Sequence, residues 1–342
     1  MNHDKLRVGV VGLMVGDGHV SDYIASASVE ELVICDMNQQ RLKEIGDKHG
    51  VKRRYADFVE MLDKEKLDAV SIALPNKLHM PMTIQALEAG CHVLCEKPMA
   101  RTAAEAEKMA AAAKRAGKKL MINFNQRFHP LHQAMKGLVD AGKLGEIYFA
   151  RTLWRRRRGV PRWYTLTQDN CGGGPLVDLG VHRLDLAMWL CGYPEPEWVL
   201  GNAYSKVEAQ EFPDFELEDM AAAMIRMKNG AMFDLEASWA SHCEGEALST
   251  RIFGSKGGLV LEGSKNLFLT EIDGKLANIE LVEGEFGNAP LAPTLTIRQA
   301  FLDAILNDTE VPCTPAQGLT INKILDAIYR SAKTGAPVKM EG

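Results

Sequence analysis

The sequence lacks any long apolar run and any excess of positive charge. No apolar stretch approaches the roughly 20 residues that span a bilayer, and the formal net charge is −5. The start of the chain has no apolar segment behind a basic stretch, so no secretory leader is expected. These absences predict a cytoplasmic protein that binds neither membranes nor nucleic acid.

Cysteine is present seven times, but not in a pattern of metal ligands or disulfides. The number is odd and the spacing is scattered, with only Cys91 and Cys95 close together. A cysteine-based zinc site needs a second pair, which the sequence lacks. We therefore expect no metal, and reduced thiols of the kind found in cytoplasmic proteins.

Short apolar runs alternate with helical segments in the first third of the chain. Strands are predicted at 6–12, 31–36, 67–75, 91–98 and 118–125. The alanine-rich segment 102–117 between the last two has strong helix propensity. This alternation predicts an α/β fold with a parallel, doubly wound sheet.

The remainder of the chain has a different pattern. Strand-like segments follow a helix predicted near 130–141, and Asn229-Gly230 between two apolar runs is a strong hairpin signal. Two further helices are predicted near 296–307 and 316–334. We expect a first domain over 1–124 and a second, α+β domain with its own sheet over 125–342.

The chain also lacks a complete dinucleotide fingerprint. In G-x-G-x-x-G the first glycine allows a tight turn, the second lets the pyrophosphate approach, and the third packs helix on strand. Gly12 fits the first role, and Gly16 fits the third if the loop is one residue short. Met14 takes the second position, so the phosphate contacts are expected from backbone N–H groups around Met14 and Val15.

Asp36 ends the second predicted strand, downstream of this loop. A carboxylate there accepts hydrogen bonds from the adenosine ribose and repels a 2′-phosphate, which favours NAD over NADP. The alternative is that Asp36 only caps the following turn. The residue alone leaves both interpretations open.

Two more predicted strands end in polar segments, LPNKLH and CEKP. Ligands of open α/β sheets bind outside the carboxyl ends of the strands. We therefore expect the following residues at the cofactor edge: Leu74, Pro75, Asn76, His79, Glu96 and Lys97.

Asp178, His182 and Asp185 are spaced i, i+4 and i+7, which places them on one face of a helix. The helix is predicted to begin after Gly172–Gly174, with Pro175 in its first turn. The surroundings are very apolar, so these polar groups need partners. A buried hydrogen-bond network and an acid/base site both fit, whereas a metal site is disfavoured by the missing cysteine partner and H-E-x-x-H signature.

Together, these motifs resemble the glucose–fructose oxidoreductase, inositol dehydrogenase and rhizopine-catabolism (Gfo/Idh/MocA) family. The segments DAVSIALPNKLH, ALEAGCHVLCEKPMA and GGGPLVDLGVHRLDLAMWLCG carry the resemblance, which runs from Val8 to ILDAIYRSAKTGAPV near the C-terminus. It implies a Rossmann domain over 1–124 and, over 125–342, a domain with an open, mostly antiparallel sheet for substrate binding and oligomerisation.

The resemblance implies an NAD-dependent oxidoreductase that moves hydride between nicotinamide and a hydroxyl of a sugar, an inositol-like polyol or a sugar acid. Members are commonly homodimers or homotetramers. Two other activities occur among relatives and stay open: glycoside cleavage by transient oxidation with bound NAD, and regulation by a non-catalytic dinucleotide-binding protein.

The resemblance also assigns roles to residues. Lys97, Asp178 and His182 correspond to the catalytic Lys, Asp and His of the family. His182 would be the general base in oxidation, Asp178 would orient its imidazole, and Lys97 would reach the nicotinamide ribose and the reacting oxygen. The Lys97–Pro98 bond is expected to be cis, and Asp185 is expected to be structural.

Three further segments have two interpretations each. Asn125 and Arg127 lie where the family approaches the nicotinamide, so they either contact cofactor or substrate or pin the domain junction. The run Arg155–Arg158 is either a solvated face or an ion-pair strip between subunits, or else Arg156 binds an anionic group of the substrate. Trp163 either stacks on a sugar ring or packs within the protein.

Overall fold

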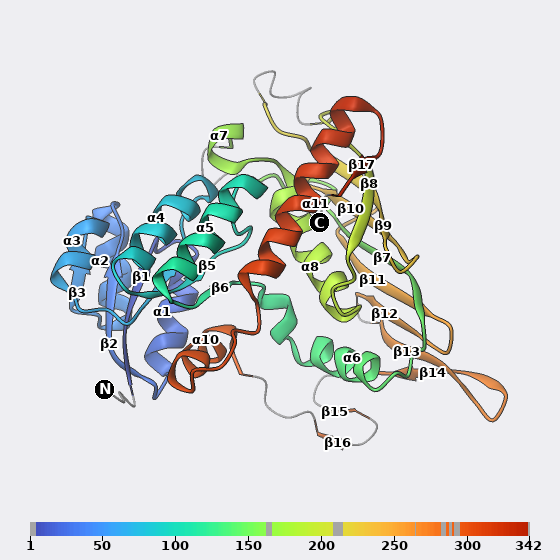
Figure 1. Cartoon of the computed structure of the whole chain (residues 1–342), viewed down its shortest axis with the longest axis horizontal. Helices are drawn as coiled ribbons and strands as arrows, with labels where there is room; N and C mark the ends of the chain where they lie inside the picture. Colours follow the sequence, from blue (N-terminus) through green and yellow to red (C-terminus); the bar gives the residue numbers. More distant parts are fainter. Residues whose placement is uncertain are drawn as a thin grey trace. The chain divides into compact units, whose positions relative to one another are not determined.

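The structure, a computed structural model, describes residues 5–161, 166–207, 215–263, 265–281, 285–286, 289–290 and 295–340 (Figure 1). The chain forms two compact units. The first comprises Met1–Phe124 and Leu295–Asn322, and the second comprises Asn125–Thr294 and Lys323–Gly342. The division into 1–124 and 125–342 therefore needs one correction, because Leu295–Asn322 belongs with the first unit.

This returning segment is held in the first unit by helix α10 (Ile297–Leu306). Arg298 Nε lies 3.2 Å from Asp22 Oδ2, and Ser26 Oγ donates a hydrogen bond of 2.6 Å to Gln299 Oε1. Both partners lie on or just after helix α1, which packs beside α10. Sequence periodicity identified the helix but did not indicate the surface that it covers.

The first unit contains a six-stranded parallel sheet in the order β3-β2-β1-β4-β5-β6. Its strands are β1 (Leu6–Val11), β2 (Val29–Cys35), β3 (Arg53–Tyr55), β4 (Ala69–Ile72), β5 (His92–Cys95) and β6 (Leu120–Ile122). Its other helices are α1 (Gly16–Ala25), α2 (Gln39–His49), α3 (Phe58–Lys64), α4 (Asn76–Glu88) and α5 (Ala103–Ala116). The strand order reverses between β1 and β4, which is where such folds bind dinucleotides. The predicted doubly wound Rossmann sheet is confirmed, and the short β3 is an addition to it.

Local sequence explains where these elements begin and end. Strand β4 is buried along its whole length, as expected for a sheet covered on both faces. Asn38 caps α2 by accepting a hydrogen bond from the Arg41 N–H, and Thr102 caps α5 by accepting one from the Glu105 N–H. Helix α5 ends at Gly117, whose φ of +63° suits glycine.

The second unit contains a nine-stranded sheet in the order β14-β13-β12-β11-β7-β10-β9-β8-β17. These strands are β7 (Ile147–Arg155), β8 (Pro196–Tyr204), β9 (Met220–Met227), β10 (Met232–Ser238), β11 (Ala247–Gly254), β12 (Gly258–Glu262), β13 (Lys265–Ile272), β14 (Lys275–Glu280) and β17 (Val338–Lys339). Strands β7 and β10 are parallel, and the other neighbours are antiparallel. The mostly antiparallel sheet and the hairpin at Asn229-Gly230 are confirmed. A two-residue pair, β15 (Glu285–Phe286) and β16 (Ala289–Pro290), lies apart from this sheet.

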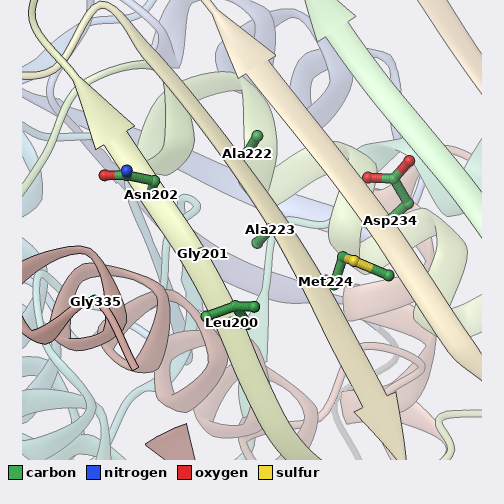
Figure 2. A pocket seen from close by; sticks show the side chains of 8 residues that line it. All are labelled: Leu200, Gly201, Asn202, Ala222, Ala223, Met224, Asp234 and Gly335. Carbon is green, nitrogen blue, oxygen red and sulfur yellow. The ribbon is translucent and has the colours of Figure 1, made fainter. Parts of the chain in front are cut away.

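Helical segments of this unit are η1 (Asn125–Phe128), α6 (Pro130–Asp140), α7 (Gln168–Cys171), the π-helical turn η2 (Leu176–Gly180) and α8 (Val181–Leu190). Helix α11 (Pro315–Thr334) starts in the first unit and ends in the second. Residues of β9 alternate between a covered and an open face of the sheet: Ile225 is buried, whereas Met224 is 44% exposed. Figure 2 shows the open face over β8, β9 and β10, where Leu200, Asn202 and Met224 border a shallow hollow of about 360 Å³.

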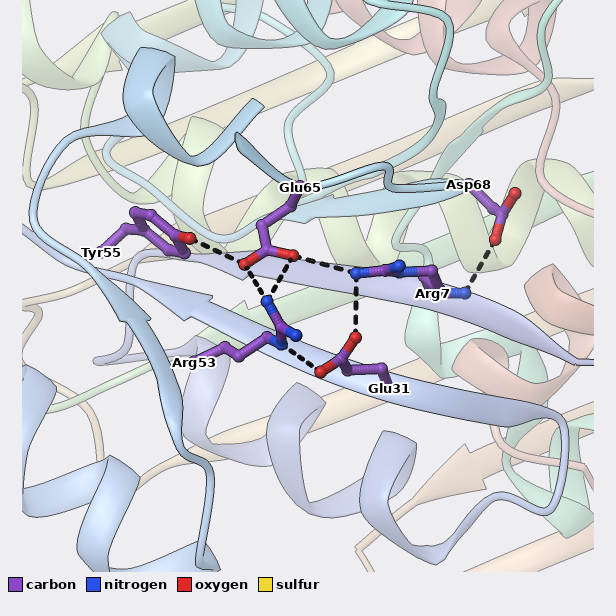
Figure 3. A network of polar contacts seen from close by, with 6 residues as sticks. All are labelled: Arg7, Glu31, Arg53, Tyr55, Glu65 and Asp68. Carbon is purple, nitrogen blue, oxygen red and sulfur yellow. Dashed lines mark hydrogen bonds and ion pairs between the residues drawn. The ribbon is translucent and has the colours of Figure 1, made fainter. Parts of the chain in front are cut away.

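A network of charges lies at the amino ends of the first unit's strands (Figure 3). The buried Glu65 carboxylate accepts hydrogen bonds from Arg7 Nη2 at 3.0 Å, Arg53 Nη1 at 2.9 Å and the Tyr55 hydroxyl at 2.7 Å. Glu31 pairs with both arginines. Burial by itself raises the pKa of Glu65, but the hydrogen bonds from Tyr55 and Arg53 and the two positive charges lower it below its usual value.

Candidate active site

The glycine loop after β1 has a shape that matches the shortened fingerprint. Gly12 has a φ of +85°, and a Cβ at this position would collide with the carbonyl oxygen of Ala73. Gly16 opens α1, where a Cβ would stand 3.0 Å from Val10 Cγ1. These are the roles of the first and third glycines. Met14 between them is 39% exposed, so its side chain does not fill the loop.

The Asp36 carboxylate accepts hydrogen bonds from two segments, the glycine loop and the turn that follows β2. Its Oδ2 accepts a hydrogen bond of 2.8 Å from Leu13 N in the glycine loop, and its Oδ1 accepts one of 2.8 Å from Asn38 N. A carboxylate has about four lone-pair positions, so acceptor capacity toward a ribose remains. The Gly12 turn leaves no room for a side chain, and no side chain caps the start of α1 at Val15. The N–H groups of this loop and the Asp36 carboxylate therefore fit a dinucleotide.

Burial changes the interpretation of His79, which we expected at the cofactor. The side chain is fully buried, and its Nδ1 and Nε2 lie 2.7 Å from the Pro98 carbonyl and 2.8 Å from the Leu74 carbonyl. Helix α4 starts at Asn76, so His79 lies in its first turn and faces inward. Burial also lowers the pKa of the imidazole. His79 joins the loops after β4 and β5 and is corrected to a positioning residue.

Glu96 is likewise buried, and its carboxylate is bonded within the protein. Its Oε1 lies 3.1 Å from His19 Nε2 and accepts a bond from Asn123 Nδ2, while Oε2 accepts one of 3.1 Å from Lys97 N. Burial by itself raises the pKa of Glu96, but the bond from His19, the nearby charges of His19 and Lys97, and the bond from Asn123 lower it to about 2. His19 also contacts Ser71 Oγ at 2.8 Å.

This buried network fixes the start of the segment that carries Lys97. The Lys97 side chain is partly exposed, and the Lys97–Pro98 peptide is cis, as the resemblance implied. Sequence reasoning missed His19, Ser71 and Asn123. Their only sequence signal is that each is a polar residue inside or beside an apolar strand or helix.

In the second unit, Asp178 and His182 lie on either side of a change of helix type. Asp178 is in the π turn η2 and His182 is in α8. The Trp239 indole N–H donates a bond of 3.0 Å to Asp178 Oδ2, and the His182 ring lies 6.0 Å from the Trp154 ring. Both side chains are partly exposed. Such π turns occur often at functional sites.

Asp185 lies one turn after His182 in the same helix, α8, and its carboxylate is buried against Arg127. Arg127 Nε and Nη2 donate bonds of 3.0 and 2.6 Å to the two carboxylate oxygens, and Nη2 also donates to the Tyr193 hydroxyl. Arg127 is only 1% exposed. Arg127 therefore holds η1 against α8, and its burial contradicts the prediction that it contacts the substrate. Asn125, in the same short helix, is exposed.

Two of the three glycines before Pro175 pack against residues that sequence reasoning missed, Glu218 and Tyr329. Glu218 accepts hydrogen bonds from Gly174 N at 2.9 Å and Leu176 N at 3.2 Å, and from the Tyr329 hydroxyl at 2.8 Å. A Cβ at Gly173 would collide with Tyr329, and one at Gly174 with the Glu218 backbone. Burial raises the pKa of Glu218. Close packing against this carboxylate positions the turn that carries Asp178.

Two residues of the arginine run pair with carboxylates of the same chain. Arg156 Nε lies 2.9 Å from Glu246 Oε1, and Arg155 Nε lies 3.6 Å from Glu236 Oε2. Arg156 thus already has a carboxylate partner. Trp163 lies outside the described residues.

Comparisons with known proteins decide the family. Residues 6–124 match the model of an oxidoreductase family with an NAD-binding Rossmann fold, and residues 136–340 match the model of its C-terminal alpha/beta domain. The chain belongs to the Gfo/Idh/MocA oxidoreductase family.

Similar proteins cover nearly the whole chain. D-glucoside 3-dehydrogenase of Escherichia coli (strain K12) is 32% identical over 353 residues, 99% of each chain. Myo-inositol 2-dehydrogenase of Thermotoga maritima is 28% identical over 253 residues, 74% of each chain. A solved levoglucosan dehydrogenase in complex with NADH and levoglucosan has a TM-score of 0.87 and 25% identity, over 98% of this chain and 99% of that one.

The Gfo/Idh/MocA protein is thus an NAD(P)-dependent dehydrogenase that acts on CH–OH groups, with NAD as its cofactor. Among the residues that the structure describes, no cluster of three His, Cys, Asp or Glu side chains could hold a metal ion. Within the same residues, no helix is both long and apolar enough to cross a membrane.

Proposed function

We propose that this dehydrogenase oxidises a secondary hydroxyl of a sugar, polyol or sugar derivative, and reduces the corresponding ketone in the reverse direction. The observation that carries the proposal is the placement of His182 one turn after Asp178, with Asp178 fixed by the Trp239 indole. The matched relatives are named for a glucoside and an inositol, both rich in hydroxyl groups.

Oxidation removes a hydride from the carbon and a proton from the oxygen of the alcohol. His182 accepts the proton, because imidazole exchanges protons readily near neutral pH. Asp178 stabilises the resulting imidazolium through its negative charge. When bound, NAD supplies the nicotinamide C4 that takes the hydride, so the products are a ketone, NADH and one proton.

Lys97 supplies positive charge to the substrate oxygen during this transfer. Its backbone N–H is tied to Glu96 Oε2, and Glu96 is held in turn by His19 and Asn123. The side chain therefore starts from a fixed point at the carboxyl end of β5. We propose that Gly12, Met14, Val15, Asp36 and the segment Leu74–Asn76 contact the cofactor, joined by Asn125.

The test is a Lys97→Met variant assayed by NADH absorbance with a panel of sugars, inositols and sugar acids. We expect turnover to fall by at least about 1,000-fold, as for the loss of a charge that stabilises the transition state, with an unchanged circular dichroism spectrum. Lys43→Met is the matched control, because the Lys43 side chain is 78% exposed and its charge pairs with Asp47 on the next turn of the same helix. Full activity in Lys97→Met would refute the assigned role.

We further propose that the chain forms a homodimer or homotetramer through the open face of β8, β9 and β10. Leu200, Tyr204 and Met224 are each at least 38% exposed there, and apolar side chains gathered on an uncovered sheet face favour association. Light scattering of the purified protein would give the mass of two or four chains. A cytoplasmic location is also proposed, supported by seven free cysteines.

A further inference from the structure

Trp154, near the end of β7, connects the proposed catalytic histidine to the arginine run. Its indole lies 6.0 Å from the His182 ring, tilted by 45°. The guanidinium of Arg156 stands over the same indole at 5.2 Å, a distance typical of a cation–π contact. Arg156 is therefore one side chain away from the place where a substrate hydroxyl would be deprotonated.

Glu246 completes this group from the residue just before β11. Its Oε1 accepts a hydrogen bond of 2.7 Å from Trp154 Nε1 and one of 2.9 Å from Arg156 Nε. These donors hold the carboxylate in place, and the bond from Trp154 is the main cause that lowers its pKa. The Glu246 side chain is 49% exposed, so the carboxylate keeps acceptor positions toward solvent. We call Trp154, Arg156 and Glu246 the acceptor cluster.

The charges of the acceptor cluster bear on the kind of substrate that the enzyme takes. A bare arginine in this position would favour a carboxylate or phosphate, because guanidinium matches their geometry. Here the guanidinium of Arg156 already pairs with the Glu246 carboxylate. An anionic group arriving beside Trp154 would meet the charge of Glu246 before it could reach Arg156.

We propose that the acceptor cluster selects uncharged, hydroxyl-rich substrates and rejects sugar acids. Glu246 accepts a hydrogen bond from a substrate hydroxyl remote from the reacting carbon, and it withholds Arg156 from anionic groups. Like charges placed together are a common means of rejecting a wrong ligand. This proposal rests on the proposed dehydrogenase reaction at His182 and narrows its substrate class to neutral sugars and polyols.

The experiment compares two substrates that differ only in one group, methyl D-glucoside and methyl D-glucuronide, with myo-inositol as a third neutral compound. The full-length enzyme with NAD is assayed by NADH formation, and the ratio of kcat/KM for glucoside over glucuronide is the readout. We expect the wild type to favour the glucoside. Glu246→Gln should lower that ratio about tenfold, a free-energy change of ~1.4 kcal/mol, because Arg156 becomes available to a carboxylate.

Two further variants separate selection from general damage. The double variant Glu246→Gln with Arg156→Gln should lose the gained activity on the glucuronide, since no guanidinium remains to bind it. Glu262→Gln is the matched control, because Glu262 is a similarly exposed glutamate paired with an arginine of β11, Arg251. Its ratio should equal that of the wild type.

The outcomes distinguish the two proposals. A wild type that favours the glucuronide, or a Glu246→Gln ratio equal to that of the wild type, overturns the selection by the acceptor cluster and leaves the dehydrogenase reaction standing. If the wild type oxidises none of the three compounds, any other sugar or any polyol, the proposed function fails and the selection fails with it.

Discussion

Two buried glutamates of the first unit have similar surroundings but lie at opposite ends of the strands of the sheet. Glu65 lies at the amino ends of the strands, among Arg7, Arg53 and Tyr55 (Figure 3). Glu96 follows β5 at the carboxyl ends, beside His19 and Asn123. In both, hydrogen bonds and nearby positive charge outweigh the cost of burial and lower the pKa.

The difference between them lies in what each carboxylate holds. Glu65 ties strands to one another at the edge remote from ligand binding, so its charge contributes to stability. Glu96 ties down the backbone of Lys97 at the edge where such folds bind their ligands. Similar electrostatics thus stabilise the fold at one end of the sheet and hold the proposed catalytic lysine at the other.

Among the changes that test this comparison of the two carboxylates, the largest expected effect comes from Glu96→Gln. The amide cannot accept from His19, Asn123 and Lys97 as the carboxylate does, so Lys97 loses its fixed starting point. We expect kcat/KM to fall about 30-fold, ~2 kcal/mol in transition-state stabilisation. Steady-state assays with NAD check this, and Glu65→Gln, the same change in the other buried carboxylate, is the control. Equal losses of kcat/KM in both variants would contradict the proposed difference between Glu96 and Glu65.

A smaller effect is expected from Glu65→Gln, and on stability rather than turnover. The free energy of unfolding at pH 7 should fall by about 1–2 kcal/mol, as for the loss of charge-assisted hydrogen bonds. Because folding lowers the pKa of Glu65, its contribution is complete above the unfolded value and is lost as pH falls through the folded one. Urea unfolding at several pH values should show wild type and variant converging below about pH 4.5. A constant gap in acid would contradict an ionic origin.

The smallest effect is expected from Met14→Gly, which restores the middle glycine of the fingerprint. Met14 is 39% exposed and does not fill the loop, so its removal should change KM for NAD by no more than about threefold. Gly12→Ala is the contrasting variant, because its Cβ would collide with Ala73. A large gain in NAD affinity from Met14→Gly would show that the methionine obstructs the pyrophosphate.

Features set by neighbours in sequence could be predicted, and features set by distant partners could not. Apolar periodicity located five of the six strands of the first sheet, and Asn229-Gly230 located a hairpin of the second, because these signals are local. The tight turn at Gly12, with its positive φ, also followed from its motif. His79 and Arg127 were misassigned because their partners, Pro98 and Asp185, are brought to them only by the folded chain.

The proposed acid/base pair shows the same limit at closer range. The i, i+4 spacing of Asp178 and His182 predicted a regular helix, whereas Asp178 lies in a π turn. Glu218, which packs against the preceding glycines and positions that turn, is distant in sequence and has no local signature. Resemblance to a family supplied the roles that spacing left open.

The return of Leu295–Asn322 to the first unit has a practical consequence for protein engineering. The chain passes between the units at three places: after Phe124, after Thr294 and within α11 after Asn322. A fragment cut after Phe124 would lack α10 and leave the α1 surface around Asp22 and Ser26 bare. Grafting a different substrate unit onto this cofactor unit would therefore require three junctions, one of them inside a continuous helix.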